Sequence, residues 1–120
     1  MRINHLALKN FRNYDFASFT FSPSTNVLIG KNAQGKTNLI EAIYLLSIAK
    51  SFRTRSTQEL IQFNKEYARI LGNVESHHIQ RDLEMILFED GKQAKVNGSK
   101  CAKTSEFVGY FNVVVFTPDD

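Results

Sequence analysis

The alternation of apolar and polar residues at the start of the chain predicts β-structure. Residues 2–10 read as a strand, and the aromatic-rich segment 13–22 reads as a second strand, antiparallel to the first. Residues 10–13 supply the turn between them. The wholly apolar segment 26–30, NVLIG, is typical of a strand buried on both faces.

The apolar period then changes to that of a helix. Positions spaced three and four apart are apolar over 36–50, which predicts an amphipathic helix. These positions are Leu39, Ala42, Ile43, Leu46 and Ala49. Further along, Ser56 and Glu59 form a capping-box pattern and predict a short helix at 56–63.

The pattern from residue 66 to 105 predicts an antiparallel meander. Its strand candidates are 67–75 and 81–89. Asp90–Gly91 is a strong hairpin signal, and Asn97–Gly98 is a second turn signal.

The last residues predict a short helix at 103–111 and a buried strand at 112–116. Pro118 and two acids follow this strand at once, so we expect the chain to be a fragment of a longer protein. The order of elements predicts an α/β fold with a mixed sheet and an antiparallel subdomain. It does not match the simple alternation of a doubly wound nucleotide kinase.

Residues 30–37 carry the strongest chemical signal. Gly30, Gly35, Lys36 and Thr37 fit the phosphate-loop pattern G-x-x-x-x-G-K-[ST], placed between a buried strand and a helix. The glycines let the main chain approach phosphates, and amide groups from residues 33 to 37 form an anion nest at the helix N-terminus. Lys36 is expected to reach the β- and γ-phosphates of ATP, and the Thr37 hydroxyl to ligate Mg²⁺.

The roles of four other polar residues each have two interpretations. Asn32 and Gln34 could touch a phosphate or bond their own backbone. Asp119 and Asp120 follow an apolar strand, where a catalytic acid would organise Mg²⁺ and water, but two such acids also suit a solvated loop.

Composition narrows the class of protein. The 120 residues suit one domain, and the single cysteine, Cys101, excludes an internal disulfide and fits a cytoplasmic location. No apolar run is long enough to span a membrane. Residues 1–60 hold eight Lys and Arg against three Asp and Glu, whereas residues 61–120 hold seven against nine. The basic first half suits an anionic ligand.

Five segments together resemble the RecF family, ABC-type ATPases of the SMC superfamily. They are KNFRNY, LIGKNAQGKTNLIEAIYLL, AKSFRT, ELIQF and NVVVFTPDD. The resemblance runs in register over the whole chain. It implies a P-loop NTPase fold of the ABC ATPase-head type, with residues 1–120 forming part of the N-terminal lobe and the second lobe absent.

The resemblance also implies a function. Such proteins bind ATP and DNA in replication, recombinational repair and the SOS response. They dimerise with ATP between two subunits, on single-stranded or gapped DNA, and act with RecR and RecO to load recombinase. Weak ATPase activity is expected of the full-length protein and none of this fragment alone, because the signature motif that faces the phosphate loop is missing.

Residue by residue, the family's nucleotide contacts fall on Gly30, Lys31, Asn32, Ala33, Gln34, Gly35, Lys36, Thr37, Asn38 and Arg12. For Arg12 a solvated turn is the alternative. Arg53 and Arg55 are candidate DNA-backbone contacts, with a solvated loop as the alternative. Asp119 and Asp120 stand where the wider ABC group has a glutamine loop.

Six further polar residues suggest no site. A solvated face is the interpretation of Lys92, Lys95, Lys100 and Lys103, and His77 and His78 have no evident metal partner.

Two other function classes stay open: a small-molecule kinase with the same loop, and a non-catalytic interaction module that retains the loop as an anion site.

Overall fold

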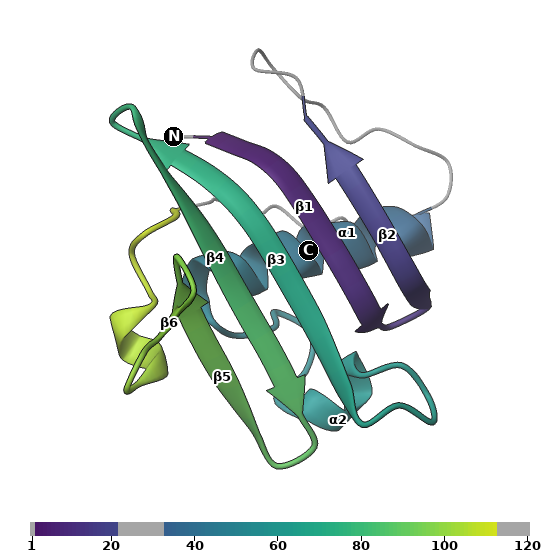
Figure 1. Ribbon diagram of the computed structural model, residues 1–120. Helices are drawn as coiled ribbons and strands as arrows, with labels where there is room; N and C mark the ends of the chain where they lie inside the picture. Colours follow the sequence, from purple (N-terminus) through teal and green to yellow (C-terminus); the bar gives the residue numbers. More distant parts are fainter. Residues whose placement is uncertain (1, 22–32, 113–120) are drawn as a thin grey trace.

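The strand β1 (Arg2–Phe11) lies inside a sheet that joins both halves of the chain (Figure 1). The computed structural model describes residues 2–21 and 33–112, and for residues 33–36 the backbone alone. Within these ranges the strands form one six-stranded sheet of order β2-β1-β3-β4-β5-β6, with every pair antiparallel. The other strands are β2 (Tyr14–Thr20), β3 (Tyr67–Ser76), β4 (Ile79–Phe88), β5 (Gly91–Val96) and β6 (Ser99–Lys100).

The helix α1 (Ala33–Ile48) crosses one face of this sheet and packs on β3 and β4 (Figure 1). Its apolar stripe and the inward residues of β1, β3 and β4 make the core. The core residues with no exposed surface include Leu6, Leu8, Leu45, Leu46, Ile70, Leu83, Met85 and Leu87. The helical period therefore predicts the buried stripe of α1 correctly.

Both predicted hairpins form, but the first turns one residue earlier than its Asp90–Gly91 signal. Glu89 and Asp90 form the turn between β4 and β5, and Asn97 and Gly98 form the turn to β6. Asn97 and Gly98 both have positive φ, 50° and 84°, a conformation that Asn and Gly adopt more readily than other residues.

Two helix predictions are confirmed only in part. The helix α2 (Thr57–Leu60) is shorter than expected, and the Ser56 side chain makes no capping hydrogen bond. Instead the Ser56 amide donates to Thr54 Oγ1 at 3.0 Å. In the region 103–111 only one 3₁₀ turn, η1 (Thr104–Glu106), forms.

A mixed sheet was expected, whereas all the described strands are antiparallel. The two other strand predictions fall at 26–30 and 112–116, and apart from Asn112 these residues lie outside the described ranges.

Gly72 in β3 lets α1 approach the sheet closely. A Cβ at this position would lie 2.5 Å from Leu46 Cδ1, and Leu46 is fully buried. We expect Gly72→Ala to destabilise the protein by about 1–3 kcal/mol through overpacking, as measured by urea unfolding. Gly91→Ala is the matched control, because a Cβ at Gly91 meets no atom within 4 Å. Equal unfolding midpoints for the two variants would contradict this account of the packing.

Candidate functional site

The first turns of α1 define the candidate site. The helix begins at Ala33, so Lys36 and Thr37 of the phosphate-loop pattern fall in its first two turns. The first amide groups of a helix have no intrahelical acceptor and carry partial positive charge. The loop residues Gly30, Lys31 and Asn32 and the acid pair Asp119 and Asp120 lie outside the described residues.

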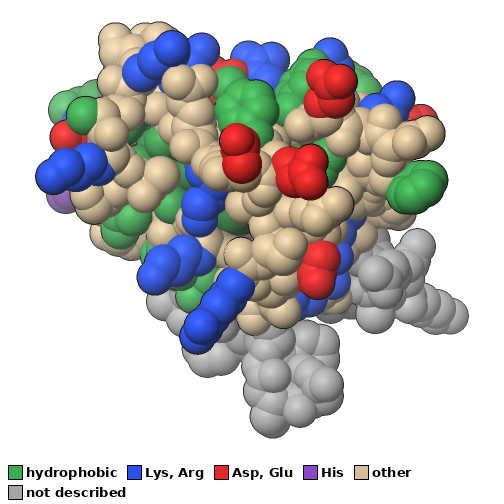
Figure 2. Space-filling view, turned by 90° about the horizontal axis from the view of Figure 1, so that it is seen from below, with side chains coloured by type: hydrophobic (Ala, Val, Ile, Leu, Met, Phe, Trp, Pro, Cys, Tyr) green, Lys and Arg blue, Asp and Glu red, His purple; other side chains and the backbone are tan. Residues whose placement is uncertain are grey.

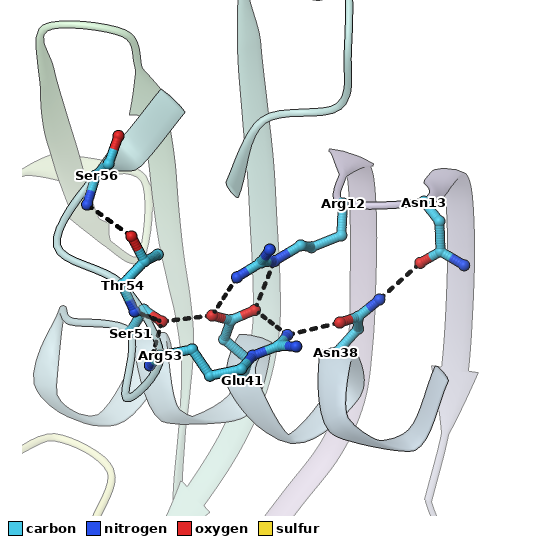
Figure 3. Close-up of polar contacts among 8 residues, drawn as sticks. All are labelled: Arg12, Asn13, Asn38, Glu41, Ser51, Arg53, Thr54 and Ser56. Carbon is cyan, nitrogen blue, oxygen red and sulfur yellow. Dashed lines mark hydrogen bonds and ion pairs between the residues drawn. The ribbon is translucent and has the colours of Figure 1, made fainter. Parts of the chain in front are cut away.

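A buried carboxylate, Glu41, lies two turns into the same helix, and its side chain has no exposed surface (Figure 3). Arg12 donates to it twice, from Nε at 2.9 Å and from Nη2 at 3.0 Å. Arg53 Nη2 donates to the same carboxylate at 2.5 Å, and the Ser51 hydroxyl also donates to it. Two cations and one anion therefore meet here, and the cluster keeps one surplus positive charge.

Asn38, one turn before Glu41, extends this cluster toward the β1–β2 turn. It is nearly fully buried, its Nδ2 donates to Asn13 Oδ1 at 2.8 Å, and its Oδ1 accepts from Arg53 Nη2 at 2.6 Å (Figure 3). Asn38 thus links the segment that follows α1 with the segment that precedes β2.

The ionised form of Glu41 is favoured despite burial. Burial alone would raise the pKa of this carboxyl, but hydrogen bonds from Arg12, Ser51 and Arg53, together with the charge of Arg12, hold the pKa below its ordinary value. The side chains of Arg12 and Arg53 keep exposures of 22% and 26%. The cluster therefore places its surplus positive charge near the protein surface, beside the first turns of α1.

Arg12 is held in a strained backbone conformation. Its φ of 53° lies in the left-handed region, where a bulky residue is uncommon and costs about 1–3 kcal/mol. The amide of Arg12 donates to Leu60 O at 2.9 Å, and the amide of Gln62 donates to Asn10 O at 2.8 Å. These bonds fix the β1–β2 turn against the end of α2 and aim Arg12 at Glu41.

An open cleft of about 750 Å³ borders the cluster. Arg12, Asn13 and Asn38 line one side, and Gln62 and Phe63 lie on the segment that lines the other. Gln62 Oε1 is buried and accepts no hydrogen bond from the described residues. Cavities of 300–1,000 Å³ are the usual size of small-molecule sites.

The structure separates the two arginines that the sequence grouped as DNA contacts. Arg53 turns toward Asn38 and Glu41, whereas Arg55 lines a second pocket with Lys50 and Lys92. Lys92 is exposed, as expected of a solvated face, but its Nζ also donates to Ala49 O at 2.7 Å.

Sequence reasoning missed three members of the cluster: Glu41, Asn13 and Ser51. For Glu41 a signal was available, because a single carboxylate within the apolar segment LIEAIYLLSIA must be paired if the helix is buried. For Asn13 and Ser51 the sequence offers no comparable signal.

The part of the chain that the structure describes holds no group of three or more His, Cys, Asp or Glu suited to a metal ion. His77 and His78 form the β3–β4 turn with positive φ and are exposed. Within the same residues, no helix has the length and apolar character needed to cross a membrane.

Comparison with known proteins identifies the family. The family model described as RecF/RecN/SMC N terminal domain matches residues 2–116. This chain belongs to that family. Over all 120 residues it is 48% identical to the DNA replication and repair protein RecF of Lacticaseibacillus casei strain BL23 and 47% identical to that of Staphylococcus aureus strain JH9.

Solved structures agree with this assignment. The structure of the recombination mediator protein RecF-ATPrS in the RecFOR pathway matches with a TM-score of 0.89 and 38% identity, covering 98% of this chain and 32% of that one. The SMC head domain from Thermotoga maritima matches with a TM-score of 0.64 at 22% identity, covering 88% of this chain and 40% of that one, and it supports the fold alone. The ABC ATPase-head fold expected from the sequence is thus confirmed.

The chain covers 32% of the length of the RecF relatives from both organisms. Their described functions therefore belong to proteins about three times as long as this chain.

Proposed function

We propose that this chain supplies the phosphate-binding half of an ATP site. The observation that carries the proposal is the Arg12–Glu41–Arg53 cluster, whose surplus positive charge lies beside the helix that begins in the phosphate-loop pattern. A helix N-terminus with a neighbouring cation attracts a phosphate group. Likeness to the structure of RecF-ATP, at 38% identity and a TM-score of 0.88, supports the same ligand.

Each residue of the pattern has a role in this proposal. The triphosphate is held by residues 30–37, with Lys36 at the β- and γ-phosphates. The Asn38 side chain is engaged by Asn13 and Arg53, so Asn38 positions the site and does not contact the phosphates through its side chain. Arg12 provides a further cation at the edge of the site, where the cleft begins. The cleft is large enough for the rest of the nucleotide.

The donor set also fits Mg²⁺. Thr37 is partly buried in the second turn of α1, and a hydroxyl oxygen is a hard ligand of the kind that Mg²⁺ prefers. Mg²⁺ bound there with the nucleotide would neutralise phosphate charge. Asp119 and Asp120 remain candidates for the acid that orders the metal and water.

We further propose that the natural protein containing this chain acts in DNA replication and recombinational repair in the cytoplasm, and in the SOS response. ATP bound between two protomers would promote dimerisation on single-stranded or gapped DNA, with RecR and RecO as partners in loading recombinase. Because the Arg53 side chain is engaged by Asn38 and Glu41, we assign the DNA-backbone contact to Arg55.

The test measures whether ATP changes the DNA affinity and the oligomeric state of the natural protein. Fluorescence anisotropy of a labelled gapped duplex would give the affinity of the natural protein with and without Mg²⁺ and ATP, while sedimentation gives its mass. We expect ATP to raise the DNA affinity by about 5- to 150-fold and to convert protomers into dimers. If ATP binds but changes neither the affinity nor the mass, the proposed coupling is wrong.

A further inference from the structure

A second pocket, of about 380 Å³, lies at the opposite end of α1 from the nucleotide site. Leu45 and Leu60 form apolar parts of its wall. Its polar lining consists of Lys50, Ser51, Thr54, Arg55, Thr57 and Lys92. No motif in the sequence pointed to this combination, which brings together the segment after α1 and the start of β5.

The charges of this pocket are of one sign. Three of the described residues that line it are cations, and none is an acid, whereas the first cleft is bordered by Glu59, Glu66 and Glu89. On the face drawn in Figure 2, several Lys and Arg side chains lie at the lower left and others along the top edge, while the acidic side chains lie mostly in the middle and right. A concave site with three cations favours an anionic ligand.

Lys92 is the cation under most constraint. Its ammonium donates to Ala49 O, just past the C-terminal end of α1, where the helix dipole favours a positive charge. Although the residue as a whole is exposed, partial burial of its ammonium, and then the nearby charge of Lys50, lower the pKa of Lys92. An anion between these two lysines would relieve their repulsion.

The lining is also held in place before any ligand arrives. Thr57 Oγ1 donates to Phe88 O at 2.8 Å, which ties the start of α2 to the end of β4, three residues before β5 begins. Ser51 Oγ accepts from the amides of Arg53 at 2.9 Å and Thr54 at 3.2 Å. The segment that carries Arg55 is therefore fixed relative to the strand that carries Lys92, which lowers the entropy lost on binding.

We propose that Lys50, Arg55 and Lys92 form a binding pocket for a backbone phosphate of DNA, separate from the nucleotide site. The proposal rests on the proposed function, which supplies DNA as the ligand, and it adds the residues that grip one phosphate. Arg55 provides a planar fork for phosphate oxygens, while the two lysines act as point charges. Ser51 lines this pocket and also donates to Glu41, so the two sites share one segment of chain.

The test measures how DNA affinity depends on salt. The natural protein with Mg²⁺ and ATP is compared with Arg55→Gln, Lys92→Gln and the double variant on the same gapped duplex. Glutamine is polar and uncharged, so Lys92→Gln tests the charge of the ammonium. Lys95→Gln is the matched control, because residues 92 and 95 of one strand point to opposite faces of the sheet.

Each phosphate contact contributes about 0.9 to the slope of log affinity against log salt. The pocket holds one phosphate, so we expect the double variant to lower the slope by about 0.9 and each single variant by part of that amount, with Lys95→Gln unchanged and ATP affinity unchanged in all. At 0.1 M salt the loss of this one contact corresponds to roughly eightfold weaker binding by the same relation.

Three results would overturn the proposal. Unchanged slopes in both single variants and in the double variant would show that the pocket does not contact phosphate, although ATP-dependent DNA binding by the parent protein would leave the proposed function standing. An equal loss of ATP affinity would assign the pocket to the nucleotide site instead. A parent protein without measurable DNA affinity would overturn the DNA-binding part of the proposed function as well as the pocket's ligand.

Discussion

Replacing Glu41 with glutamine is expected to destabilise the protein by about 3–5 kcal/mol at pH 7. The substitution removes the only anion of the cluster and leaves the guanidinium groups of Arg12 and Arg53 facing each other at 22% and 26% side-chain exposure. Loss of one partner from a buried ion pair is costly because the remaining charge is uncompensated. Urea unfolding of the parent and the variant would measure the difference.

The control for this prediction is Glu75→Gln. Glu75 pairs with Arg2 at 3.2 Å, but the side chains keep 20% and 42% exposure. An exposed pair of this kind contributes about 0–1 kcal/mol. If Glu41→Gln were no more destabilising than Glu75→Gln, the buried cluster would not have the energetic role that its geometry indicates.

The pH dependence follows from the lowered pKa of Glu41. The folded state holds this pKa below the ordinary value of 4.5, so the carboxylate stabilises the fold above that value. This stabilisation by the Glu41 carboxylate is lost as the pH falls through its pKa in the folded state. The reason is that Glu41 in the unfolded chain has the higher pKa and takes up a proton first. The difference between parent and Glu41→Gln should therefore be largest at neutral pH and shrink in acid.

Local signals explain what the sequence predicted well. The β4–β5 and β5–β6 turns depend on a few adjacent residues with turn preferences, and the stripe of α1 depends on one helical period. The phosphate-loop pattern is similarly local. Such features are encoded within a few residues and can be recognised without a tertiary structure.

The features that the sequence did not predict depend on contacts between residues that are far apart in the sequence. Leu6 pairs with Gly72 across 65 intervening residues, which turns a separate hairpin and meander into one sheet. Arg53 appeared as a surface arginine because its partners, Asn38 and Glu41, face it only once α1 has packed and the chain has turned back. The short α2 reflects the same limit, since the Ile61 bridge to Phe11 takes residues that the capping pattern had assigned to a helix.

The prediction that tests the nucleotide site itself is Lys36→Ala. In the proposed site this lysine makes charge-assisted contacts to the β- and γ-phosphates, each contributing about 1.5–3 kcal/mol. Losing two such contacts should weaken ATP binding by about two orders of magnitude or more, as measured by calorimetric titration with Mg²⁺ present. ATP-dependent dimerisation and the ATP-dependent gain in DNA affinity should be lost with it.

This effect should not arise from unfolding. Alanine has the highest helix propensity, so the substitution should not weaken α1. Lys95→Ala removes the same charge from β5 and should leave ATP affinity unchanged. Undiminished ATP binding by Lys36→Ala would reject the site assignment. Loss of ATP binding with an unchanged salt-dependent DNA affinity, measured without ATP, would show that Lys36 and the Lys50–Arg55–Lys92 pocket recognise phosphate independently. In that case ATP controls assembly, and the pocket contributes directly to DNA binding.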